Sequence, residues 1–278
     1  MALFSSLFSL YGIGTLEKQI SISFLVYSLL VPAVMAIAFG TFLYLKTKKL
    51  SSFYLFLLCY IFGIYSILDL GTWAPNAEIV MFTWSILRIF SLGSFVFSYW
   101  FLYVFLREQD LPIWQKIFTS LALLTTIIPT ALSTNMSIYI APTGIAIENQ
   151  GVFNLLSTCQ FFFILVVIIF SIIEYFKAGD AVRKRRVILA GSGVTIFLFV
   201  YFLVMVVIGY VISINLWGLG ANNYIYNIDS YASFGMPIFL AFLGYLIAKY
   251  QAFDVKLIKS IVYMVILMVL LFIGLFFA

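Results

Sequence analysis

The residue types that most often carry chemistry are scarce in this sequence. It has 278 residues and no histidine, so it lacks the side chain that most often acts as a general base or accepts a phosphoryl group. Its two cysteines, Cys59 and Cys159, lie inside apolar runs without a second ligand at metal-binding spacing, which indicates packing roles. Glycine-rich phosphate loops, HExxH and GxSxG are also absent. We therefore expect no enzyme activity, no cofactor and no metal site.

Arg88 is the most informative polar residue, because it lies roughly 14 Å inside the apolar run 79–106 at the rise of an α-helix. A charge at such a depth costs about 2.5–3.5 kcal/mol on insertion scales, so it normally faces the interior of a bundle and has a partner. Helical side chains lean toward the N-terminus, so Arg88 and Asp69 on an antiparallel neighbour lean toward each other. We expect an Arg88–Asp69 pair in the outer half of the bundle, with Gln160 or Tyr201 at similar depth. The pair either belongs to a ligand site or only locks two helices, and the sequence leaves both open.

Aromatic residues cluster near the predicted outer boundary of the membrane-spanning runs. Such residues usually form a belt at the membrane–water interface and sometimes form the wall of a ligand pocket. Trp73 is the member of this cluster that follows the run containing Asp69. The hypothesis of a ligand site or intramembrane polar pair therefore comprises Arg88, Asp69, Gln160, Trp73 and Tyr201.

The composition indicates the class of protein that holds these residues. Hydrophobic residues make up 65% of the chain, charged residues make up 9%, and the mean hydropathy is +1.17. Soluble domains have roughly 25% charged residues. The apolar runs are too long and continuous for barrel strands, so we expect an all-α integral membrane protein. The net charge of +5 fits basic loops beside a lipid bilayer and is not a nucleic-acid signal.

The apolar runs predict a bundle of seven transmembrane helices and an eighth, C-terminal transmembrane helix. We expect residues 1–20 to form an extracytoplasmic segment, 21–250 the seven-helix sensor region, and 251–278 a cytoplasmic connector and the eighth helix. That last apolar run predicts that a further C-terminal part follows in a longer protein. A polar loop is expected between the fourth and fifth runs. The runs are 21–45, 51–70, 79–106, 117–132, 152–176, 187–212, 231–248 and 260–278.

The positive charges predict the orientation of these helices. All but two of the 15 Lys and Arg residues fall in four groups that alternate with the runs. Because translocation of basic loops is opposed, we expect these groups in the cytoplasm, the N-terminus outside, and a multi-pass protein of the prokaryotic cell membrane. Glu174 precedes Lys177 by three residues, which predicts a surface pair. The groups lie in 46–49, 107–116, 177–186 and 249–259.

Three stretches carry a family resemblance: WSILRIFSLGSFVFSYWFLYVF, RKRRVILAGSGVTIF and GMPIFLAFLGYLIAKYQAFDVKLIKSIVY. They resemble the N-terminal seven-transmembrane region of bacterial and archaeal sensor histidine kinases. The third stretch is similar to the family's exit from the membrane, through Tyr245, Lys249, Tyr250, Phe253 and Asp254. The run 79–106 lacks the proline often found in this family, and no phosphoacceptor or ATP-binding domain follows.

The resemblance implies a sensory input module. A small-molecule or membrane-borne cue would bind among the outer halves of the helices, and the signal would leave through Tyr250, Phe253 and Asp254. A cytoplasmic kinase or other signalling partner, and a homodimer, are implied partners. A small transporter or channel is the alternative, which would need a polar path across the membrane. A purely structural membrane protein is a third reading.

Overall fold

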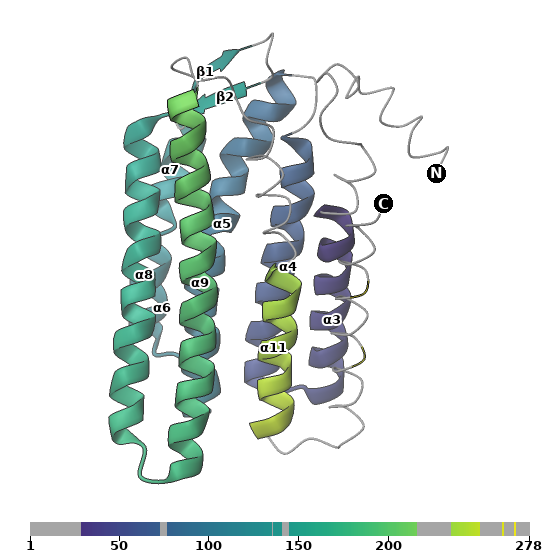
Figure 1. Cartoon of the computed structure of the whole chain (residues 1–278), viewed down its shortest axis with the longest axis vertical. Helices are drawn as coiled ribbons and strands as arrows, with labels where there is room; N and C mark the ends of the chain where they lie inside the picture. Colours follow the sequence, from purple (N-terminus) through teal and green to yellow (C-terminus); the bar gives the residue numbers. More distant parts are fainter. Residues whose placement is uncertain are drawn as a thin grey trace.

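The computed structural model describes residues 29–72, 77–134, 136–140, 145–215 and 235–250, and the single positions 263 and 270. The long helices lie roughly side by side in one bundle (Figure 1). In chain order the elements are α3 (Val31–Thr47), α4 (Leu50–Gly71), α5 (Ala77–Arg107), α6 (Ile113–Leu121), α7 (Leu124–Ala131), β1 (Met136–Ile140), β2 (Ile145–Glu148), α8 (Gln150–Lys177), α9 (Ala181–Asn215) and α11 (Gly235–Tyr250).

The two ends of the bundle differ in charge. One end of the bundle holds the α3–α4 turn, the α5–α6 link, the α8–α9 turn and the last residue of α11 (Figure 1). We call it the basic end. All four predicted basic groups have described members at this end, for example Lys46, Arg107, Arg185 and Lys249. The opposite end, where β1 and β2 lie, is the hairpin end.

Within the described ranges, four helices are long and apolar enough to cross a membrane, which indicates a membrane protein. They are Leu50–Gly71, Glu78–Arg107, Gln150–Lys177 and Ala181–Val204, and they confirm the apolar helices predicted over 51–70, 79–106, 152–176 and 187–212. Two shorter apolar helices, Val31–Thr47 and Ile238–Tyr250, coincide with parts of the predicted first and seventh spans. The expected segment 1–20 and, apart from positions 263 and 270, the connector and eighth helix in 251–278 lie outside the described residues.

The predicted fourth span, 117–132, is wrong as a single helix. Its residues form two short helices, α6 and α7, separated by a turn at Ala122 and Leu123. Threonine hydroxyls bond to the backbone at this break: Thr125 Oγ1 donates to the Ala122 carbonyl at 2.7 Å, and Thr126 Oγ1 donates to the Leu123 carbonyl at 2.8 Å. Such local bonds compete with helix continuation. A helix of nine residues is only about 14 Å long, so α6 cannot cross a bilayer alone.

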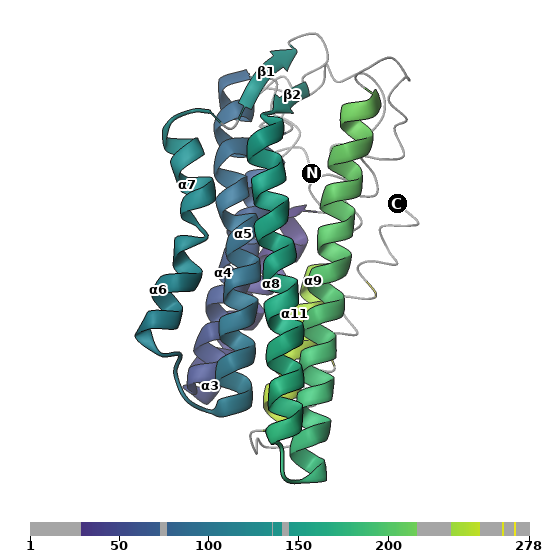
Figure 2. The ribbon, with the colours of Figure 1, turned by 90° about the vertical axis from the view of Figure 1, so that its left-hand side faces the viewer.

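The predicted polar loop after this span contains a β-hairpin. β1 and β2 pair antiparallel, with Tyr139 opposite Ala146 and Ile140 opposite Ile145. The hairpin lies across the hairpin end, beside the start of α8 (Figure 2). The described part of the bundle is therefore helical apart from this two-stranded cover.

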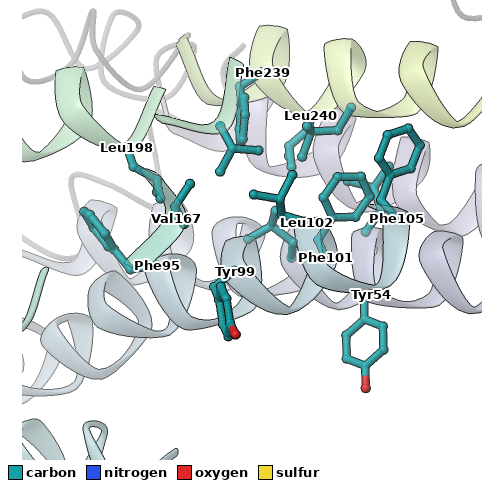
Figure 3. Packing of buried hydrophobic residues seen from close by; sticks show 14 of the residues in the cluster. Tyr54, Phe95, Tyr99, Phe101, Leu102, Phe105, Val167, Leu198, Phe239 and Leu240 are labelled. Carbon is teal, nitrogen blue, oxygen red and sulfur yellow. The ribbon is translucent and has the colours of Figure 1, made fainter. Parts of the chain in front are cut away.

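α5 is the central helix of the bundle. In the most apolar stretch of α5, 78% is buried within the protein, whereas the corresponding stretches of α8 and α9 are 33% and 28% buried. The side chains of α5 belong to the same core cluster as those of α11, and Leu102 of α5 lies close to Leu240 of α11 (Figure 3). A residue on α5 therefore reaches several helices at once.

Small residues allow the closest helix contacts. A Cβ added at Gly40 of α3 would lie 2.6 Å from Cβ of the buried Cys59, so Cys59 has a packing role against α3. A Cβ at Gly244 of α11 would clash with the ring of Phe39, which is fully buried. These contacts fix how α4 and α11 approach α3.

Candidate functional site

Gln160 of α8 faces the central helix α5. Its side chain is buried, and Nε2 donates a hydrogen bond to Ser91 Oγ at 3.0 Å. Ser91 is one helical turn from Arg88 on α5. A buried amide normally needs such a partner, because an unsatisfied one costs about 1–3 kcal/mol. The structure therefore brings Gln160 of α8 close to the turn of α5 that carries Arg88.

Asp69 and Arg88 lie on the adjacent helices α4 and α5. Asp69 is buried near the end of α4, and Thr72 Oγ1 donates to its carbonyl at 2.7 Å. Arg88 is half-buried, with its guanidinium 5.7 Å from the centre of the Trp84 ring, a cation–π contact. Both residues have further interactions. The direct Arg88–Asp69 pair stays a prediction, and Trp73 lies outside the described residues.

Tyr201 belongs to a line of aromatic rings that crosses the bundle. Its ring centre lies 6.2 Å from that of Tyr65 on α4 and 6.1 Å from that of Phe197 on α9. Phe197 stacks on Phe239 of α11 with a centre distance of 3.8 Å and an interplanar angle of 5°. We call Tyr65, Tyr201, Phe197 and Phe239 the aromatic line. Tyr65 is one turn before Asp69, so the line begins beside a predicted site residue and ends on α11.

Tyr250 is the last residue of α11 and the first of the predicted output residues. Its ring packs against the core and lies 5.7 Å from the Lys249 ammonium group. Its hydroxyl is buried, with no hydrogen-bond partner within the described ranges. Phe253 and Asp254 lie outside those ranges. Of the predicted output segment, the structure thus shows that the end of α11 is held by packing.

Glu174 is a residue whose role the sequence reading missed. The expected surface pair with Lys177 is wrong, because the Glu174 side chain is only 2% exposed and its partners are arginines. Nε and Nη2 of Arg107 both donate to Glu174 Oε1, at 2.9 and 2.7 Å. Nη2 of Arg183 lies 3.8 Å from Oε2. One carboxylate of α8 therefore joins the end of α5 to the start of α9.

Aromatic rings surround the same guanidinium group. Arg107 Nη1 donates to Tyr103 Oη at 2.9 Å, and the guanidinium lies 4.7 Å from the Tyr103 ring and 5.4 Å from the Phe170 ring. Planar guanidinium groups suit such sites because they bind a carboxylate and stack on rings together. We call Arg107, Glu174, Arg183 and Tyr103 the charge clamp.

Arg186 makes a second link between α9 and the end of α5. It donates to the carbonyl of Phe105 and, through Nη1, to Glu108 Oε1 at 2.7 Å. Glu108 has a left-handed backbone (φ 57°), which ends α5. A cation at the C-terminus of a helix is favoured by the helix dipole. Part of the basic cluster 177–186 is therefore used inside the protein, at the end of its central helix.

Asp110 anchors the link between α5 and α6. Its carboxylate accepts hydrogen bonds from Tyr54 Oη at 2.6 Å, Lys116 Nζ at 2.6 Å and the Leu111 amide at 2.8 Å. Partial burial acts to raise the pKa of this carboxyl, but the bonds from Lys116, Tyr54 and Leu111 outweigh it and hold the pKa below its ordinary value.

Replacing Asp110 with asparagine is expected to lower the free energy of unfolding by about 1 kcal/mol, the usual value of a partly exposed pair with hydrogen bonds. Because the folded pKa is depressed, this contribution is complete above the unfolded pKa of about 3.9 and is lost as pH falls through the folded pKa. Thermal unfolding of the unmodified chain and of Asp110→Asn is measured in detergent over a range of pH. The difference in stability between them should be constant near neutral pH and should disappear in strong acid. A difference that persists unchanged in strong acid would contradict the assignment.

The described contacts are mainly packing contacts, hydrogen bonds and ion pairs between helices. In the ranges that the structure describes, no group of three or more metal-ligating side chains comes together. The features that stand out are a buried polar contact on α5, an aromatic line ending on α11, and a charge clamp at the basic end. Comparison of the chain with protein-family models, curated proteins and solved structures finds no match.

Proposed function

We propose that this chain is the membrane-embedded sensory input module of a signal-transduction receptor of the histidine-kinase kind. A cue binds in the half of the bundle toward the hairpin end, near Asp69, Arg88 and Gln160. The resulting shift of helices reaches α11 and leaves the membrane through Tyr250 and the residues after it. The observation that carries this proposal is the aromatic line, which connects α4 beside Asp69 to α11.

The stacked pair of Phe197 and Phe239 is the most restrictive step of this line. At 3.8 Å and 5° the two rings are in van der Waals contact over their faces, so α9 and α11 cannot rotate independently at this level. Packed interfaces of this kind respond to a local shift by changing between discrete arrangements. A change around Tyr201 is therefore expected to alter the position of α11.

The orientation proposed for this module follows from the basic end. Lys and Arg residues favour the cytoplasmic side, so the basic end faces the cytoplasm and the N-terminus lies outside, in the membrane of a prokaryotic cell. The signal then arrives at the side where a kinase or another signalling partner can receive it. Such receptors commonly act as pairs, so a homodimer is part of the proposal.

A small transporter is the second candidate, and one observation favours it. Ser91, Ser94 and Ser98 are buried at helical spacing on α5, and the Ser98 hydroxyl lacks a hydrogen-bond partner in the described part of the chain. With Gln160 they form a polar strip inside the bundle. A strip of this kind lines a path in a transporter, and it stabilises helix packing in a receptor.

Distance measurements between spin labels test the sensory proposal without knowledge of the cue. Labels are placed at the exposed positions Ala181 of α9 and Lys249 of α11, through Ala181→Cys and Lys249→Cys with Cys159→Ala, in the full chain reconstituted in nanodiscs. Two distance populations are expected. Phe197→Leu should change the ratio of the two populations about two- to tenfold, because it removes the interaction free energy of one stacked aromatic pair.

Phe199 provides the matched control, because it lies two residues away on α9 and is exposed. Phe199→Leu should leave the populations unchanged. A single population that neither substitution alters would contradict the sensory proposal. Solute flux across protein-containing vesicles, lost on Gln160→Leu, would favour the transporter instead.

A further inference from the structure

Two buried polar atoms near the basic end have no hydrogen-bond partner among the described residues. One is Nε of Arg186 on α9, and the other is the hydroxyl of Tyr250, the last residue of α11. The other nitrogens of Arg186 do have partners, because Nη1 and Nη2 donate to Glu108 and to the Phe105 carbonyl. A buried polar atom without a partner costs more free energy than a satisfied hydrogen bond contributes. The described packing therefore carries a cost at both atoms.

The contacts between α9 and α11 fix how the two helices are aligned. Phe197 of α9 stacks on Phe239 of α11. One turn closer to the basic end, a Cβ at Gly193 would clash with the ring of Phe242, so the helices run antiparallel. They lie side by side as far as the last residue of α11 (Figure 1).

This alignment places Arg186 and Tyr250 at the same level. Arg186 lies eleven residues before Phe197, and Tyr250 lies eleven residues after Phe239. Eleven residues make about three turns of an α-helix, so each residue returns to the side of its helix that carries the stacked ring. The two residues therefore lie on facing sides of α9 and α11, both about 16 Å from the stacked pair along the helix axes.

Phe105 of α5 connects the surroundings of both residues. The Arg186 guanidinium lies 4.6 Å from the centre of the Phe105 ring. Tyr250 packs against the core cluster to which Phe105 belongs. The two unsatisfied atoms thus belong to the packed region where the ends of α5 and α11 approach the first turns of α9.

We propose that Arg186 and Tyr250 couple the end of α11 to α9: in the second arrangement of the bundle, Nε of Arg186 donates a hydrogen bond to the Tyr250 hydroxyl. The inference rests on the proposed sensory function, which supplies the two arrangements. The bond removes the cost of both unsatisfied atoms at once, so it favours the second arrangement over the described one. Tyr250 is the first of the proposed output residues, so the bond alters the point from which the signal leaves α11.

The test measures distances between spin labels in the full chain in nanodiscs. Labels are placed at the exposed positions Ala181 of α9 and Ile238 of α11, through Ala181→Cys and Ile238→Cys with Cys159→Ala. This pair leaves Lys249 in place, whose ammonium group lies 5.7 Å from the centre of the Tyr250 ring. The ratio of the two distance populations reports the balance between the arrangements.

Two substitutions remove the proposed bond from either side. Tyr250→Phe removes only the hydroxyl, and Arg186→Lys keeps the positive charge but has no N–H group at the place of Nε. Each is expected to raise the population whose distance matches the structure about tenfold relative to the other. Both substitutions together should give the same tenfold change, because only one bond is lost.

Each substitution has a matched control on the same helix. Tyr245→Phe also removes a hydroxyl from a ring beside Lys249, at 5.3 Å, but the Tyr245 hydroxyl is not among the buried unpaired atoms of the described residues. Arg185→Lys makes the same exchange at an exposed position. Neither control should change the ratio.

The possible outcomes separate this coupling from the sensory function itself. Two populations that respond to Phe197→Leu but to neither Tyr250→Phe nor Arg186→Lys would overturn the coupling and leave the sensory proposal standing. A change of about a hundredfold in the double variant would show two independent effects and would also overturn it. A single population in the unmodified chain, insensitive to every substitution, would reject both.

Discussion

Replacing Arg107 with methionine is expected to lower the free energy of unfolding by about 3 kcal/mol, because it leaves the Glu174 carboxylate buried without its closest partner. Glu174 is 2% exposed and Arg107 is 31% exposed, so the carboxylate cannot recover its hydration while the fold stays closed. Arg183 remains 3.8 Å away and offsets only part of the loss. Thermal unfolding in detergent or nanodiscs measures the effect.

A double-mutant cycle separates the charge clamp from simple packing. Glu174→Leu combined with Arg107→Met removes both charges, and this double variant should be more stable than Arg107→Met alone. Arg183→Met, at a more exposed and more distant partner, should cost much less. If the double variant lost the sum of the two single effects, the two residues would not be coupled and the charge clamp would be disproved.

Replacing Gly244 with valine is the other change with a large expected effect. A side chain at this position would overlap the buried ring of Phe39, and neither helix has space to absorb it. Overpacking of this kind costs about 1–3 kcal/mol and moves the backbone. We expect a loss at the upper limit of this range, and a displaced α11 that is visible as a changed distance between labels at Ala181 and Lys249.

Two further variants identify the clash as the cause. Phe39→Ala together with Gly244→Val should recover part of the lost stability, because it provides the missing volume. Gly93→Ala on α5 is the control, since a Cβ there meets only ordinary contacts at 3.7 Å and beyond. It should be neutral or slightly stabilising. A destabilisation by Gly93→Ala as large as that by Gly244→Val would mean that glycines in general, and not this contact, determine the packing.

The long helices were predictable because an uninterrupted apolar run determines both helix and membrane character. α4, α5, α8 and α9 lie where the runs predict them. Two local features were misread. The Thr125 and Thr126 hydroxyls bond to the backbone where α6 ends, which apolar content alone does not show. The alternating β-branched residues of 136–148 are a hairpin pattern, but the polar surroundings suggested a loop.

The candidate site was only partly predictable, because its contacts join distant parts of the chain. Gln160 was expected near Arg88 from depth alone, and the contact with Ser91 is consistent with that depth. Glu174 and Arg107 are 67 residues apart, so spacing on one helix pointed to Lys177 as the partner. One sequence feature did point to this pair, because Glu174 and Arg107 both lie near the basic end of their apolar runs. Depth in the membrane could have indicated the pair, but which faces meet depends on packing.

The position of α11 has a consequence for how the chain is made. α11 packs on α3 and α4 as well as on α9 (Figure 1), and Phe39 of α3 is covered by Gly244. α3 and α4 leave the ribosome long before Gly235 is synthesised. Until α11 follows, the Phe39 ring lacks the contact with Gly244 that helps to bury it. The packing of α3 is therefore completed only by the last of these helices to be made.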